Sequence, residues 1–128
     1  MTTTTQRRYD DPNFTIRRLA TLAGHAPTAS VVHAAFVAPV DIVAYRVGAI
    51  ATIAGTTSTN TYTVRNGTTS VGLLTLANSA ALFANTADLD GVTISAGTSL
   101  NFLKGTDATG VADFFIEYKV PVGAALPV

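Results

Sequence analysis

Residues 59–74, TNTYTVRNGTTSVGLL, hold the pattern that decides the fold. Asn66-Gly67 lies between two runs in which apolar and polar side chains alternate. Asn-Gly is the preferred pair for a two-residue type I′ turn, because both central residues of that turn need a positive φ. The expected strand pairs are Arg65 with Thr68, Val64 with Thr69, Tyr62 with Val71 and Asn60 with Leu73. One face of the ribbon is then mostly apolar and the other polar, so the stretch predicts a β-hairpin with one buried face.

The alternation continues on both sides of the hairpin. One alternate set is wholly apolar in residues 41–55, DIVAYRVGAIATIAG, and another in residues 110–121, GVADFFIEYKVP, which end at a strand-breaking proline. The side chains predicted to face the core are Val43, Tyr45, Val47, Ala49, Ala51 and Ile53 in the first stretch and Ala112, Phe114, Ile116, Tyr118 and Val120 in the second. Residues 92–94 and 99–104 predict two short strands joined by a turn. Residues 31–40 predict a strand covered on both faces, because both of its alternating sets are apolar.

Short strands joined by Gly, Asn and Thr turns, with no helix-length crossover, predict an all-β chain. We expect a single antiparallel β-sandwich, jelly-roll-like, preceded by an extended N-terminal arm. The arm allows one short helix of about three turns, with Asp11 as its N-cap, Pro12 at the first helical position and Gly24 at the C-terminal stop. Residues 76–87, LANSAALFANTA, fit either a short helix capped by Asn78 or a loop.

The composition favours a protein that works in an assembly. Only 12% of the 128 residues are charged, against about 25% in typical domains, and the formal net charge is zero. Such a surface has little charge to keep copies apart. The chain has no cysteine, which excludes disulfides and thiolate metal sites. The most apolar run, residues 31–44, is interrupted by His33, Pro39 and Asp41 and is shorter than the roughly 20 residues of a membrane helix. With no signal-peptide pattern at the N-terminus, we expect a soluble protein made in the cytoplasm.

Charge divides the chain into two predicted regions. Residues 1–30 carry four arginines against two aspartates, a net charge of +2, and form the predicted partner-docking arm, whereas residues 31–128, the predicted β-sandwich domain, have a net charge of −2. Arginine suits an interface because its planar fork pairs with carboxylates and stays charged when partly desolvated. Apolar residues between the arginines would anchor the arm. The predicted contact residues are Arg7, Arg8, Tyr9, Phe14, Ile16, Arg17, Arg18, Leu19 and Leu22.

No residue pattern predicts catalysis, a metal or a cofactor. The imidazoles, His25 and His33, lie in no recognisable nucleophile motif, and His33 in its apolar stretch is best interpreted as a structural core histidine. Asp88, Asp90 and Gly91 match the first half of an oxygen-ligand calcium loop, but apolar residues follow where further ligands belong. A turn with solvated carboxylates is the favoured interpretation. We therefore expect a protein that is not an enzyme.

Residues 40–121 contain a recognisable order of strand and turn motifs. Val64-Arg65-Asn66-Gly67 matches a V-x-N-G hairpin, residues 94–102 match I-x-A-G-x-x-L-x-F, and an aromatic strand closes the run. This order of strand and turn motifs is similar to that of tailed-phage capsid decoration (cement) and head-fibre proteins, which are β-sandwich virion proteins. The resemblance implies a jelly-roll homotrimer on the capsid surface that grips the major capsid protein through a terminal arm. The arm of this chain, residues 1–30, matches no pattern of the family.

Three functions remain open. A decoration protein that binds and stabilises the outer surface of a capsid is preferred. A fibre or receptor-binding module ranks lower, because sugar sites usually need exposed aromatic rings, the chain has no tryptophan, and its other aromatic residues mostly fall on predicted core faces. A small coat protein with a nucleic-acid-contacting arm is disfavoured, since Asp10 and Asp11 separate the arginine pairs and four arginines release about four counterions at most. We expect no membrane partner.

Overall fold

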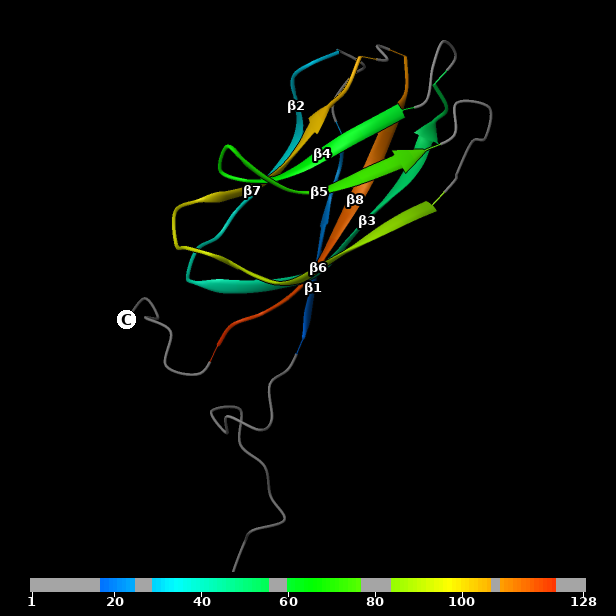
Figure 1. Cartoon of the computed structure of the whole chain (residues 1–128). Coiled ribbons are helices and arrows are strands. Elements are labelled where there is room, and N and C mark those ends of the chain that lie inside the picture. Colours follow the sequence, from blue (N-terminus) through cyan, green and yellow to red (C-terminus); the bar gives the residue numbers. More distant parts are fainter. Residues whose placement is uncertain (1–16, 25–28, 56–59, 77–83, 107–108, 122–128) are drawn as a thin grey trace, which may run out of the picture.

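The computed structural model describes residues 17–24, 29–55, 60–76, 84–106 and 109–121. In these residues the protein is all-β, with eight strands and no helix (Figure 1). The strands are β1 Arg18–Leu22, β2 Val32–Val37, β3 Ile42–Ile53, β4 Asn60–Asn66, β5 Thr69–Leu76, β6 Ala84–Ile94, β7 Ser99–Lys104 and β8 Val111–Lys119. The described part of the chain thus contains no helix of the length and apolarity that a membrane span needs.

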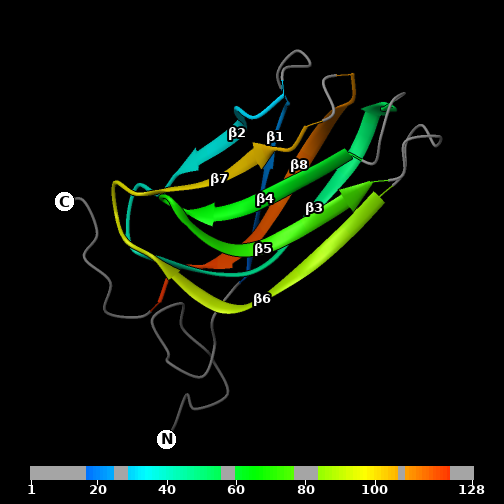
Figure 2. The same cartoon turned by 45° about the horizontal axis from the view of Figure 1, so that its top comes forward.

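The strands form two antiparallel sheets that pack face to face (Figure 2). Sheet A has the order β1-β8-β3-β6, and sheet B has the order β2-β7-β4-β5. Successive pairs nest around the β4–β5 hairpin: β3 pairs with β6, β2 with β7 and β1 with β8. The fold is therefore one long hairpin bent over on itself, which is the jelly-roll arrangement of two four-stranded sheets. The predicted jelly-roll-like β-sandwich is confirmed.

The turns that follow β2, β4 and β6 meet at one end of the sandwich (Figure 1). Backbone hydrogen bonds join them: Ala38 N donates to Thr98 O at 3.0 Å, and Gly97 N donates to Ala38 O at 2.8 Å. Gly67 N, in the β4–β5 turn, donates to Ser99 O at 2.8 Å. These bonds tie the three turns to one another across the end of the sandwich.

The central hairpin forms where the sequence predicts it, but in a different register. The two turn residues are Gly67 and Thr68, and Asn66 pairs with Thr69. Only Gly67 has a positive φ in this turn, 63°, as the first central position of a type II′ turn requires. Because Asn66 lies in the strand and not in the turn, its side-chain Nδ2 donates a hydrogen bond to Thr93 O at 3.2 Å. The predicted type I′ turn centred on Asn66-Gly67 is wrong.

A bulge in β5 adds to the register error. Val64 pairs with Gly72 and Arg65 with Ser70, so Val71 is an extra residue on this strand. Beyond the bulge, Leu74 faces the core and is fully buried, whereas Leu73 points outward and is 57% exposed. Asn60 pairs with Leu76, so the prediction that it lies opposite Leu73 is wrong. The later turn moves its partner by two residues, and the bulge adds one more, which changes the face that each β5 side chain occupies.

The core lies between the sheets and is centred on stacked aromatic rings. Phe102 of β7 stacks on Phe114 of β8 with ring centroids 4.2 Å apart, and Tyr62 of β4 meets Phe114 edge-on at 4.9 Å. His33 of β2 is buried beside these rings, 5.3 Å from Tyr62 and 6.0 Å from Phe114. Its position agrees with the interpretation of His33 as a core histidine.

The inward set of β8 is confirmed, and that of β3 is correct in its middle only. Ala112, Phe114 and Ile116 are buried, with Tyr118 and Val120 packed against the core. In β3 the buried predicted residues are Val47, Ala49 and Ala51. The predictions for Val43, Tyr45 and Ile53 are wrong: Ile42 and Ala44 fill the core instead, and Ile53 is 55% exposed. Irregularities next to Tyr45 and before Ile53 change the phase of the strand.

Strand β1 corrects the prediction of a helix in the arm. Residues 18–22 pair along their whole length with β8. Ala20 and Leu22 pack against the core, and edge pairing gives this thin apolar stripe the partner surface that an isolated helix lacks. The sandwich therefore begins at Arg18, inside the region 1–30 predicted as an arm. The proposed N-cap of the helix lies outside the described residues. In the stretch 76–87, the ends at 76 and 84–87 are strand, and residues 77–83 lie outside the described residues.

Candidate functional site

Two neighbouring bulges shape the outer face of sheet A. In β3, Tyr45 is an extra residue relative to β8, because Ala44 pairs with Tyr118 and Arg46 with Glu117. The irregularity places Tyr45 and Arg46 together on the outer side, since Ala44 and the residue after Arg46 both point inward. The β6 strand is irregular at the same level, where Asp90 and Gly91 both have positive φ, 58° and 80°. Asp88 and Asp90 are exposed there, on either side of the buried Leu89.

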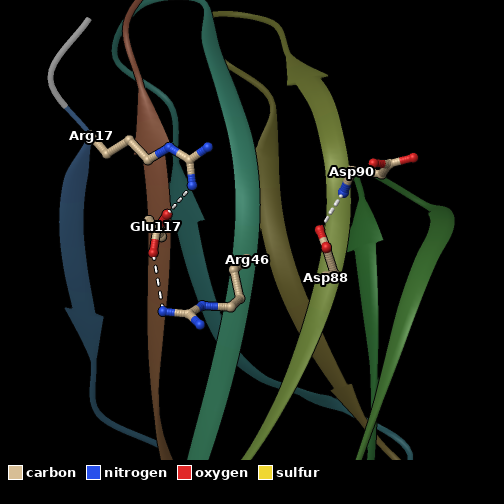
Figure 3. Close-up of polar contacts among 5 residues, drawn as sticks. All are labelled: Arg17, Arg46, Asp88, Asp90 and Glu117. Carbon is tan, nitrogen blue, oxygen red and sulfur yellow. Dashed lines mark hydrogen bonds and ion pairs between the residues drawn. The ribbon is translucent and has the colours of Figure 1, made fainter.

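Glu117 of β8 joins Arg17, which directly precedes β1, and Arg46 of β3 (Figure 3). Its Oε1 accepts a hydrogen bond from Arg17 Nη1 at 2.5 Å, and its Oε2 accepts one from Arg46 Nη2 at 3.2 Å. The hydrogen bond from Arg17 holds the pKa of Glu117 below its ordinary value, helped by the positive charges of Arg46 and Arg17 and opposed by partial desolvation. The three side chains tie the start of β1 to β8 and to β3.

Tyr45 lies beside this cluster and contacts two cations. The Arg17 guanidinium carbon is 4.2 Å from the centre of its ring, and Lys119 Nζ is 5.4 Å from it, both within cation–π range. Gly91 packs near the same ring, since a Cβ at Gly91 would lie 3.7 Å from Tyr45 Cε1. The tyrosine is therefore the apolar centre of a polar surface.

The two aspartates form the opposite side of the site. Asp88 Oδ1 accepts a hydrogen bond from Asp90 N at 2.9 Å, which stabilises the positive φ of Asp90 (Figure 3). Asp88 is the strand partner of Arg46 in β6, but the Arg46 guanidinium bonds to Glu117 on the other side. The carboxylates at these positions face solvent, as the sequence predicts for a turn with solvated carboxylates. Among the described residues, no three His, Asp or Glu side chains lie together as a metal site would need.

Together these residues line a depression of about 500 Å³. Its lining residues are Arg17, Tyr45, Arg46, Asp88, Asp90 and Glu117. Positive and negative groups alternate across the sheet, with an aromatic ring between them. Such a surface can hold a polar partner that offers hydrogen-bonding groups of both kinds and a flat apolar patch. Neither a buried acid nor a nucleophile–base pair lines it.

The outer face of sheet B has a different character. The strands of this sheet contain only two charged residues, Arg65 and the buried Lys104. Arg65 Nε donates to Asn101 Oδ1 at 2.8 Å, which holds the guanidinium against the sheet. A row of neighbouring side chains crosses the four strands: Val32, Leu103, Thr63 and Leu73. Val32 and Leu73 at its ends are 40% and 57% exposed. This face is almost uncharged and partly apolar.

The predicted contact residues fall into two groups. Arg17 belongs to the depression, and Arg18, Leu19 and Leu22 lie in or at the edge of sheet A, where Leu19 is 64% exposed and Leu22 is partly buried. The others lie outside the described residues: Arg7, Arg8, Tyr9, Phe14 and Ile16. The structure therefore places only the root of the predicted arm.

Sequence patterns miss most of the depression. Tyr45 was expected to face the core, and Glu117 lies 100 residues from Arg17 along the chain. One signal was present at Asp90-Gly91, where a turn-type pair interrupts the apolar alternation of residues 84–94.

Comparisons with protein-family models, with curated proteins and with solved structures find no match to this chain.

Proposed function

We propose that the protein is a structural virion subunit that binds the outer surface of a phage capsid and stabilises it, with the segment before β1 docking on the major capsid protein. The observation that carries this proposal is the anchored root of that segment. Arg17 is fixed by Glu117 and by the Tyr45 ring, directly before an edge strand of sheet A. A segment that starts from a fixed point needs less ordering to reach a constant docking site.

The jelly roll and its outer faces support the same function. Viral capsid proteins are among the proteins that use this fold, although the fold alone does not define a function. The nearly uncharged face of sheet B suits contact with neighbouring copies or coat subunits, because it buries apolar side chains without desolvating many charges. A homotrimer seated on the capsid is the assembly we propose.

Deletion of residues 2–16 tests the docking segment. This deletion leaves all eight described strands in place, so we expect the truncated protein to fold. It should no longer saturate phage particles that were prepared without the wild-type protein. Removing only Thr2–Thr5 is the matched control, because this run contains none of the predicted contact residues. Occupancy of the particles is measured by co-sedimentation. Equal occupancy by the long deletion and the control would refute the docking role.

A receptor-binding module is the second candidate, and the depression around Tyr45 favours it. The partly exposed ring flanked by arginines and carboxylates is the kind of surface that binds sugars, and the sequence alone placed this ring in the core. The test is retention of the full chain on host cells, with Tyr45→Ala compared with Thr63→Ala on the other sheet. Loss of retention with Tyr45→Ala alone supports the receptor role, and equal retention of both variants refutes it.

A further inference from the structure

A buried lysine and a buried asparagine meet inside the sandwich. Asn60 begins β4 and Lys104 ends the neighbouring strand β7, where Lys104 pairs with Tyr62. Both side chains point inward, and each residue is only 1% exposed. Lys104 Nζ donates to Asn60 Oδ1 at 2.7 Å. An amine is thus held against a carboxamide in a place that bulk water does not reach.

Two further contacts with described residues orient the Lys104 amine. Nζ donates to the Gly110 carbonyl at 2.6 Å and to Tyr62 Oη at 3.2 Å. Nζ gives its third hydrogen to Asn60 Oδ1, so loss of that proton leaves a neutral amine whose lone pair faces Asn60 while Gly110 O and Tyr62 Oη keep the other two hydrogens. Nζ is 2.7 Å from Asn60 Oδ1, and one C=O bond of about 1.23 Å further places it within about 3.9 Å of Asn60 Cγ. This is close to the separation of about 3–3.5 Å from which nucleophilic attack begins.

The amide nitrogen of Asn60 has the opposite environment. Among the described residues, Nδ2 is buried and has no hydrogen-bond acceptor. It packs against the backbone of Gly110, where an added Cβ would lie 1.5 Å from it. A buried N–H donor without an acceptor costs about 1–3 kcal/mol in general. The structure therefore stabilises the carbonyl side of this amide and destabilises its NH₂ group.

We propose that Lys104 and Asn60 form an intramolecular isopeptide bond. Lys104 Nζ attacks Asn60 Cγ, a new N–C bond forms, and the Cγ–Nδ2 bond breaks. Two protons of the lysine ammonium pass to the departing nitrogen, which leaves as ammonium. The side chains end as one neutral amide, so atoms and charge balance without an oxidant or another reactant. Tyr62 Oη, which contacts Nζ at 3.2 Å and both donates and accepts hydrogen bonds, accepts a proton from Nζ as the N–C bond forms.

The surroundings favour this reaction in two ways. Burial disfavours the charged form of a lysine and so favours the nucleophilic amine. The product also carries one positive charge out of the core as ammonium and removes the NH₂ group that has no acceptor in the described part of the chain. Fixed geometry supplies the rest, because a pair held at reacting distance avoids the entropic cost of encounter.

The bond would link β4 to β7, the two central strands of sheet B, across 44 residues of chain. Like a disulfide, it would close a long loop and restrict the unfolded state, in a chain that contains no cysteine. This inference does not depend on the proposed virion function. It concerns the durability of the sandwich itself.

The test is the intact mass of the purified full-length chain. We expect a mass lower than that of the sequence by one ammonia, and a cross-linked peptide pair containing Lys104 and Asn60 in tandem mass spectra after digestion. Lys104→Arg keeps the charge but removes the nucleophile, so it should have the full mass and a lower melting temperature. Lys119→Arg on the outer surface is the matched control and should keep the deficit.

Asn66-Gly67 needs its own control, because Asn-Gly pairs also lose ammonia when they cyclise to a succinimide. In an Asn66→Ser variant the deficit should persist. A wild-type chain of full mass, or a deficit that survives Lys104→Arg, would overturn the proposal. If Lys104→Arg does not fold, the wild-type tandem spectra still decide, since a cross-link and a succinimide give different peptides.

Discussion

Replacing Gly48 tests the register of sheet A. Gly48 in β3 pairs with Phe115 in β8, and the Phe115 ring covers it on the outer face. A Cβ at Gly48 would meet Phe115 Cζ at 2.3 Å and its Cε1 closer still, so Gly48→Ala must displace the ring. Gly48 is not among the residues with positive φ, so alanine itself fits the local backbone.

The magnitude follows from the partial burial of Phe115. Full burial of a phenylalanine contributes about 1.5–3 kcal/mol, so losing roughly half of it costs about 1–1.5 kcal/mol. Where the ring is absent, glycine to alanine instead stabilises by about 0.4–1 kcal/mol, because it restricts the unfolded chain. The unfolded-state gain applies in both backgrounds, so Gly48→Ala should destabilise the wild type by about 0.5 kcal/mol and stabilise Phe115→Ala. The coupling between the two sites equals the lost ring burial, about 1–1.5 kcal/mol.

Urea unfolding of the wild type, both single variants and the double variant measures this coupling. Because the cycle compares Gly48→Ala in two backgrounds, a general weakening of the strand by Phe115→Ala cancels. If Gly48→Ala has the same effect on the free energy of unfolding in both backgrounds, Phe115 does not cover Gly48. The pairing of β3 with β8 would then be wrong.

Three further predictions concern β5, the charged cluster and β1. In urea unfolding, Leu74→Ala should lower the free energy of unfolding by about 2–5 kcal/mol and Leu73→Ala by less than about 0.5 kcal/mol. The reverse order would support the register expected from the sequence. Arg17 lowers the folded-state pKa of Glu117, so as the pH falls the unfolded chain binds the Glu117 proton before the folded chain does. The stability difference between the wild type and Glu117→Gln should therefore be present at neutral pH and disappear as the pH falls below 4.5. A difference that grows toward acid pH would contradict this sign. A deletion that extends to the end of β1 should lower the melting temperature, whereas deleting only the residues before Arg17 should leave it nearly unchanged. Equal melting temperatures for the two deletions would contradict the place of β1 in sheet A.

The hairpin illustrates how far sequence patterns reach in this protein. Alternation and the Asn-Gly pair locate β4 and β5 correctly, because these signals act over a few residues. They do not decide whether Asn66 or Gly67 takes the first turn position, and they do not reveal the extra residue Val71. The turn position is settled by contacts of Asn66 with β6 and of Gly67 with β7.

Strand β1 and the depression show the same limit over longer distances. Capping residues in the arm predict a helix, yet pairing with β8 provides backbone partners and a core for residues 18–22. Arg17 was a predicted contact residue, but its partners Glu117 and Tyr45 come from strands far along the chain. Tyr45 was assigned to the core because no local signal marks the bulge. Topology, rather than local pattern, assembles this surface.

If the chain is a virion subunit as proposed, cryo-electron microscopy of the particle that carries it is the most direct test of that function. We expect eight-stranded jelly-roll density on the outer surface of the capsid, with residues 1–16 continuing from Arg17 onto the major capsid protein. Density for the protein only at the tips of fibres, or a bare capsid in particles that contain the chain elsewhere, would contradict the proposal.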